Sequence, residues 1–224
     1  MVQSVRQMGA LMQKEFLLEW RQRYALNGMV LYIVGAVFVC YLSFNARRGQ
    51  LTPIVWNTLF WIILLFTAIN AIAKSFVQER PGRQLYYYTL VSPQQIILSK
   101  IAYNTVLMLV LTLLGFATYS FVLGTPVQDL PLYVLTLVLG AVGFAASLTL
   151  VSGIASKAEN PATLMAVLSF PIILPLLLML LKLSKNALDG LDRGESVNEI
   201  GTVLAIDAIV LTLSWLLFPF LWRS

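Results

Sequence analysis

LYVLTLVLGAVGFAASLTLVSGIA, the stretch from Leu132 to Ala155, contains no charged residue. An α-helix rises about 1.5 Å per residue, so roughly 20 apolar residues cross the ~30 Å hydrocarbon core of a bilayer. This stretch is therefore long and apolar enough to form a transmembrane helix. Similar apolar runs predict six spans in all, which cover residues 25–44, 54–73, 96–123, 132–155, 162–181 and 202–222. A longer polar loop over 182–200 separates the fifth span from the sixth.

The composition of the whole chain agrees with a membrane environment. Of its 224 residues, 59% are hydrophobic and 11% are charged, whereas a soluble domain carries about 25% charged residues. Six spans leave room for loops and an N-terminal segment, but not for a folded soluble domain of ordinary size. We therefore expect an all-α, polytopic membrane protein whose transmembrane domain occupies residues 25–224.

The N-terminal segment, residues 1–24, carries charged and apolar side chains in a helical pattern. Its apolar residues recur at spacings of three and four and so form one stripe along a helix: Val5, Met8, Met12, Phe16 and Trp20. This pattern predicts an amphipathic helix that lies in the membrane interface. An ordinary helical tail is the alternative.

The distribution of Lys and Arg predicts the orientation of the spans. With the N-terminus in the cytoplasm, the 15 Lys and Arg residues divide into ten on the inner side and five on the outer side. Cytoplasmic loops carry the excess of these residues, so we expect both termini in the cytoplasm. Arg47 and Arg48 oppose this orientation because they fall on the outer side.

Several classes of chemistry are excluded by residue types that the chain lacks. It contains no histidine and a single cysteine, Cys40, which excludes a Ser-His-Asp triad, histidine ligation of a metal or haem, and a disulfide within the chain. It also lacks the G-x-x-x-x-G-K-[ST] phosphate-binding loop. We therefore expect no catalytic residues and no metal site. The net charge of +5 follows from the loops, so the expected partner is the lipid bilayer and not a nucleic acid.

The loop between the second and third spans, residues 74–95, contains two turn signals. Pro81 and Gly82 interrupt the helix that leaves the second span. Ser92-Pro93 is typical of a new helix start, with Ser92 as the N-cap and Pro93 in the first turn. A short helix over 84–90 between these signals would lie along the membrane and present a docking surface to a cytoplasmic partner. A simple connector is the alternative.

Three residues within the spans are candidates for a gate or a translocation path. Pro171 and Pro175 lie four residues apart in the fifth span, where each removes a backbone hydrogen bond and so kinks or unwinds the helix. Asp207 lies in the sixth span, and carboxylates inside the membrane usually face a bundle interior or a wet cavity. For the two prolines the alternative is a kink that serves only packing. For Asp207 the alternative is a polar residue that packs inside the bundle or lies near the membrane interface.

Small residues recur at a spacing of four in the fourth span. Ala141 is followed by Ala145, and Gly143 is followed by Ser147. Such spacing permits close contact between helices. It is compatible with a subunit interface, for example in a homodimer, and equally with packing inside the chain.

The loop between the second and third spans resembles the coupling segment of ABC-2-type permeases. The resemblance rests on Glu79-Arg80-x-Gly82, on Leu85, and on Ser92-Pro93-x-x-x-Ile97-Leu98-x-Lys100. Lys14-Glu15-Phe16 and Glu19-Trp20-Arg21 near the N-terminus, the six spans and the proline-containing stretch SFPIILPL (169–176) extend it along nearly the whole chain. Together these features are similar to the haem exporter protein B (CcmB) family, the permease of the cytochrome c maturation system. The chain departs from that pattern at residues 86–88, where three tyrosines replace the usual leucines.

The resemblance implies the partners and the function. It implies a permease subunit of an ABC complex in the bacterial inner membrane, which serves haem export or the ATP-driven release of a haem-loaded chaperone. Expected partners are a cytoplasmic ATPase that binds the ATP, a haem-handling membrane protein and a haem chaperone; haem is then a cargo and not a cofactor of this chain. The expected ATPase-docking residues are Glu79, Arg80, Gly82, Arg83, Leu85, Tyr86, Ser92 and Pro93. An ABC-2-type exporter of a lipid, drug or glycan and a non-transporting scaffold are the alternatives.

Overall fold

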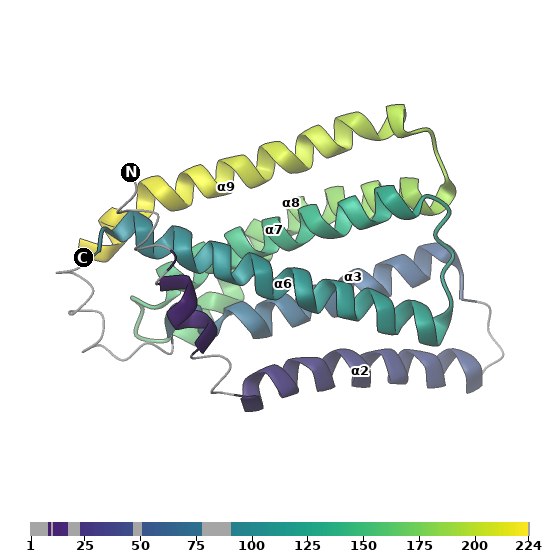
Figure 1. Ribbon diagram of the computed structural model, residues 1–224, viewed down its shortest axis with the longest axis horizontal. Coiled ribbons are helices and arrows are strands. Elements are labelled where there is room, and N and C mark those ends of the chain that lie inside the picture. The colour runs from purple at the N-terminus through teal and green to yellow at the C-terminus, as the bar shows by residue number, and fades with distance from the viewer. Residues whose placement is uncertain (1–8, 10, 18–22, 47–50, 78–90, 224) are drawn as a thin grey trace.

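The computed structural model describes residues 9, 11–17, 23–46, 51–77 and 91–223. Throughout these ranges the chain is helical apart from short turns, which confirms the predicted all-α class (Figure 1). The main elements are α2 (Arg23–Ala46), α3 (Pro53–Ile72), α4 (Lys74–Val77), α6 (Pro93–Leu123), α7 (Leu130–Ala155), α8 (Pro161–Asp189), the 3₁₀ turn η1 (Arg193–Ser196) and α9 (Val197–Arg223).

Six of these helices are long and apolar enough to cross a membrane, as the sequence predicted. Residues 11–17 are also helical, whereas most of the predicted interfacial helix lies outside the described residues. The predicted loop over 182–200 is wrong in extent, because α8 continues to Asp189 and α9 begins at Val197. α8 ends at Gly190, whose φ of 65° is left-handed, a conformation that glycine adopts readily.

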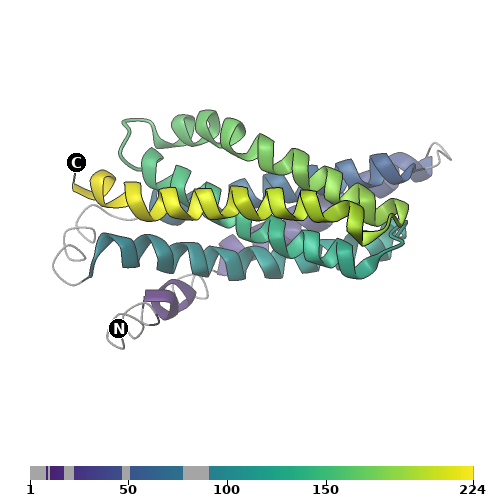
Figure 2. The ribbon, with the colours of Figure 1, turned by 90° about the horizontal axis from the view of Figure 1, so that it is seen from above.

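The long helices run antiparallel as one bundle around α7. The helical residues 11–17, the start of α2, α4 and the end of α9 all lie at one end of the bundle, here called the terminal end (left in Figure 1). The turns over 124–129 and 190–196 lie at the opposite end. α7 contacts α3, α4, α6, α8 and α9. In the most apolar stretch of 18 residues, 78% of the residues of α7 are buried, against 17% of those of α2. α7 is therefore the centre of the bundle and α2 is peripheral (Figures 1 and 2).

Small residues in α7 permit this central position. Ala141, Gly143, Ala145 and Ser147 are all buried within the chain, so the stripe of small residues packs against neighbouring helices of the same bundle. Gly140 shows how tight the packing is: a Cβ on this residue would lie 2.8 Å from the Trp61 ring of α3 and 3.2 Å from Leu180 of α8. Close packing at α7 is thus an internal contact and not a free surface.

A cluster of aromatic rings and short hydrogen bonds joins the helices towards the end opposite the termini. The rings of Trp56 and Tyr119 lie 4.8 Å apart, and the Tyr119 hydroxyl donates to the Trp56 carbonyl over 3.0 Å. Asn57 donates to the Ser184 hydroxyl over 2.8 Å and accepts from the Tyr133 hydroxyl over 3.2 Å. These contacts connect α3, α6, α7 and α8, and they satisfy polar groups that lipid could not.

We expect Gly140→Ala to lower the free energy of unfolding by about 1–3 kcal/mol, because the added methyl group overpacks the contact with Trp61. The matched control is Gly35→Ala in α2, since a Cβ on Gly35 meets no atom within 4 Å. Thermal unfolding of the purified chain in detergent measures both. Equal losses for the two variants would contradict the tight contact at α7.

Candidate functional site

The segment over 74–95, with the candidate docking residues, begins with α4 and ends in the first turn of α6. Pro93 is the first residue of α6 and Ser92 is its N-cap, as predicted, and the Ser92 backbone N–H donates to Gln95 Oε1 over 3.3 Å. Glu79, Arg80, Gly82, Arg83, Leu85 and Tyr86 lie outside the described residues, so their docking role stays a prediction. The structure instead describes how both ends of this segment are attached.

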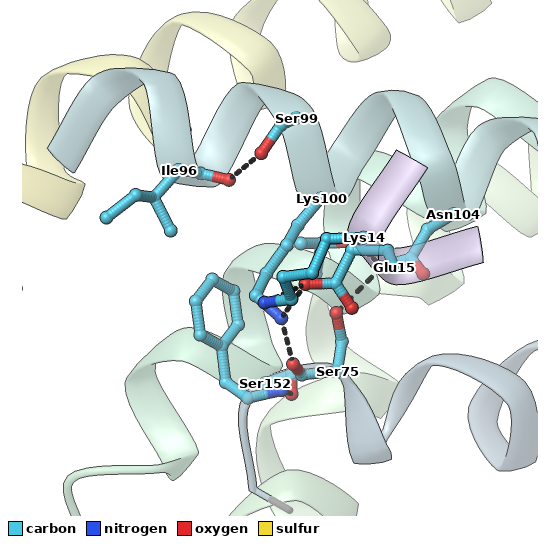
Figure 3. A network of polar contacts seen from close by, with 10 residues as sticks. Lys14, Glu15, Ser75, Ile96, Ser99, Lys100, Asn104 and Ser152 are labelled. Carbon is cyan, nitrogen blue, oxygen red and sulfur yellow. Dashed lines mark hydrogen bonds and ion pairs between the residues drawn. The ribbon is translucent and has the colours of Figure 1, made fainter. Parts of the chain in front are cut away.

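Lys100 of α6 forms the centre of the attachment (Figure 3). Its side chain is only 3% exposed, and its Nζ donates to the backbone carbonyl of Ser75 in α4 and to Glu15 Oε1 over 3.3 Å. The same Nζ lies 4.6 Å from the centre of the Phe76 ring. A buried ammonium group is costly unless such acceptors surround it. Lys100 therefore holds α4, α6 and the helical residues 11–17 together.

Glu15 is the acidic partner in this attachment. Its carboxylate accepts from Lys100 and forms a second ion pair with Lys14, 2.9 Å from Nζ to Oε1. Burial raises the pKa of the Glu15 carboxyl, but the charges and hydrogen bonds of Lys100 and Lys14 outweigh burial, so the pKa is lowered overall. The folded chain thus favours the charged carboxylate.

A layer of neutral hydrogen bonds fixes α4 against α7. Asn104 Nδ2 donates to Ser75 Oγ over 3.1 Å and to Thr149 Oγ1 over 2.8 Å. Ser152 Oγ donates to the Ala73 carbonyl over 3.1 Å and accepts from the Phe76 N–H over 3.2 Å. The close approach of these side chains is visible in Figure 3. We call Glu15, Ser75, Phe76, Lys100 and Asn104 the anchor cluster.

Sequence reasoning found part of the anchor cluster without its geometry. Glu15 and Lys100 each belong to a motif that carries the family resemblance, but the two motifs are 85 positions apart and nothing in the sequence pairs them. Ser75 was not singled out, because its contact with Lys100 uses a backbone carbonyl that any residue could supply, and its hydroxyl contact with Asn104 depends on tertiary structure. The signal that could have revealed the pair is charge: Lys100 enters an apolar span and requires an acidic partner.

The two prolines of α8 lie on the outer surface of the bundle. α8 stays helical through both Pro171 and Pro175, and it bends without unwinding (Figure 2). Both prolines are exposed. Because proline has no N–H, the carbonyls four residues earlier, at Val167 and Pro171, lose their usual helical donors.

Asp207 lies in the interior, away from the exposed side of α8. It is 4% exposed, and neither carboxylate oxygen has a hydrogen-bond partner among the described residues. Asp207 Oδ1 and Leu176 Cδ2 each lie 2.5 Å from the position that a Cβ on Gly143 would take. Gly143 is near the middle of α7, so Asp207 is deep in the bundle and not near the end of its span. The structure therefore does not bring Pro171, Pro175 and Asp207 together on one surface.

Comparison with known proteins identifies the family. The family model described as CcmB protein matches residues 6–220. The chain therefore belongs to the CcmB protein family, as the sequence motifs indicated, and is a membrane component of an ABC system for cytochrome c maturation. No curated protein and no solved structure gives a match.

Glu15→Gln tests the ionic part of the anchor cluster. A lowered pKa means that the charged carboxylate stabilises the folded chain fully above its ordinary value of 4.5, and that this contribution is lost as pH falls through the lower pKa of the folded state. We expect the variant to lose about 1.5–3 kcal/mol at pH 7, and the difference from wild type to vanish in acid. Thermal unfolding across pH measures this. Glu159→Gln, at an exposed position of the α7–α8 turn, is the control, and a pH-independent difference would argue against the pair.

A double-mutant cycle tests the contact between Gly143 and Asp207. Gly143→Ala places a methyl group against the carboxylate, so we expect a loss of about 1–3 kcal/mol. In an Asp207→Ala background the loss should shrink by at least about 0.5 kcal/mol, because the two sites touch. Gly201→Ala in α9 is the control, since a Cβ there meets no atom within 4 Å. Strict additivity of Gly143→Ala and Asp207→Ala would contradict the contact.

Proposed function

We propose that this chain is the inner-membrane permease subunit through which a cytoplasmic ATPase drives the release of a haem-loaded chaperone during cytochrome c maturation. The terminal end of the bundle then faces the cytoplasm, in agreement with the excess of Lys and Arg expected there. The observation that carries the proposal is the anchor cluster. It fixes both ends of segment 74–95 to the bundle, so a force on the docking residues is passed to the helices.

The contacts of the anchor cluster supply a route for that force. Ser75 and Phe76 precede the docking residues, and Lys100 follows Pro93 by about two helical turns. Asn104 then links Ser75 to Thr149 of α7. α7 contacts α8 and α9 as well as α3 and α6. A displacement of α4 or α6 is therefore passed by α7 to every other span except the peripheral α2.

The chain's side chains favour a neighbour as the haem ligand. Histidine holds haem iron in globins and peroxidases and shares it with Met in cytochromes c, and the chain has no histidine. Asp207, the candidate path residue in the interior, is buried beside Gly143 and lies apart from the exposed prolines. In the proposed mechanism haem therefore stays on the partner protein, and this chain transmits ATP-driven movement to it.

Affinity purification of the tagged full chain in mild detergent tests the function. Mass spectrometry of the eluate is expected to show an ATPase together with cytochrome-maturation proteins, and its absorbance spectrum to show haem only when the haem-handling protein is present. An ATPase without those proteins would point to an ABC-2-type exporter of another substrate. Loss of every ATPase from the eluate would sink the transporter assignment and favour the scaffold.

Two variants separate docking from transmission. Arg83→Glu reverses a charge in the docking segment and is expected to lower ATPase co-purification about tenfold, equivalent to 1.4 kcal/mol. Lys100→Met should leave the ATPase bound, because Lys100 is buried inside the bundle, yet reduce chaperone release. Lys157→Glu, at an exposed position of the same end, is the control. Full chaperone release by Lys100→Met would refute transmission through the anchor cluster.

A further inference from the structure

A groove opens at the end of the bundle opposite the termini, between the start of α3 and the last turns of α8. Its volume is about 290 Å³. Pro53, Ile54 and Thr58 form the α3 wall, and the α8 wall includes Leu181, Lys185 and Asp189. The walls are mostly apolar, but the α8 wall becomes charged towards the end of the helix. None of these residues takes part in the anchor cluster.

Two lysines and one aspartate line the groove, and one of the lysines is paired with a residue outside it. Lys182 also lines the groove, and its Nζ lies 2.8 Å from Glu199 Oε1 of α9. Lys185 and Asp189 have no ion pair among the described residues, although they lie four positions apart on one helix. The groove thus presents one available cation and one available anion to an occupant.

The order of these groups along α8 is complementary to that of a zwitterionic phospholipid. From the middle of the membrane outwards, α8 offers the apolar Leu181, the ammonium of Lys185 and the carboxylate of Asp189. Four residues of helix span about 6 Å, so Lys185 and Asp189 lie on neighbouring turns and can contact two charged groups of one headgroup. α3 begins at Pro53 across the groove, and the start of a helix also favours a negative group.

We propose that this groove binds a zwitterionic phospholipid whose headgroup carries a phosphate and a primary ammonium. The phosphate pairs with Lys185 beside the start of α3, the ammonium pairs with Asp189, and an acyl chain lies against Ile54 and Leu181. A purely anionic headgroup fits less well, because Asp189 would repel it. Asn57 at the groove also bonds Ser184, so the lipid reinforces an existing α3–α8 contact.

Native mass spectrometry of the delipidated full chain tests the site, with phosphatidylethanolamine and phosphatidylglycerol of equal chain length as probes. One charge contact at a membrane surface is worth about 1 kcal/mol, so wild type should prefer phosphatidylethanolamine about fivefold. Lys185→Gln should lower the binding of both lipids about fivefold. Asp189→Lys should reverse the preference towards phosphatidylglycerol. Lys157 is exposed at the other end of the bundle, so Lys157→Gln should leave the binding of both lipids unchanged.

Three outcomes would overturn the proposal. Equal binding of the two lipids by wild type would remove the role of Asp189. Unchanged binding by Lys185→Gln would remove the phosphate contact. Displacement of bound lipid by millimolar inorganic phosphate would assign the groove to a free anion. Because Lys185 and Asp189 are exposed, their substitution leaves the core of the bundle intact and the fold of each variant testable by its unfolding temperature.

Discussion

The buried ammonium group of Lys100 imposes the constraint on which the terminal end of the bundle depends. A cation that is 3% exposed needs acceptors on all sides, and no single helix can supply them. The acceptors come from Glu15, from the Ser75 carbonyl and from the Phe76 ring. The requirement to satisfy one charge thus brings together segments separated by up to 85 positions in the chain. It also fixes the two ends of the segment that carries the candidate docking residues.

α7 connects this end to the rest of the molecule, because its small residues let the other helices approach closely. Thr149 and Ser152 bind the anchor cluster and α4, Gly143 accommodates the Asp207 carboxylate, and Gly140 receives the Trp61 ring. These contacts follow one another along a single helix, so the polar anchor and the apolar core belong to one packing arrangement. A larger residue at either glycine would separate α7 from a neighbour, and the effect would extend along its length.

The sequence predicted the spans well because hydropathy depends only on local residues. Ser92 and Pro93 were also predictable, since capping is a property of a few adjacent positions. The end of α8 was not, because Lys182, Lys185 and Asp189 read as a loop; Leu183, Ala187 and Leu188 are nevertheless buried and continue the packed face of the helix. The ion pair of Glu15 with Lys100 depends on tertiary structure and has no local signal. Family membership was predictable from motifs whose geometry the sequence does not contain.

The two neighbouring helices α7 and α8 differ in stiffness, and this difference bears on how movement could pass through the bundle. α7 has 26 residues and is free of proline after its first turn, so it spans about 39 Å as a continuous hydrogen-bonded rod. α8 lacks two backbone donors, at the exposed Pro171 and Pro175, and it bends along its course (Figure 2). A displacement applied at the anchor cluster would therefore travel along α7 as a rigid shift, whereas α8 would absorb it by bending. Towards the opposite end Asn57, Ser184 and Tyr133 hold α3, α8 and α7 together by neutral hydrogen bonds, so a rigid shift of α7 would be passed there to α3 and α8.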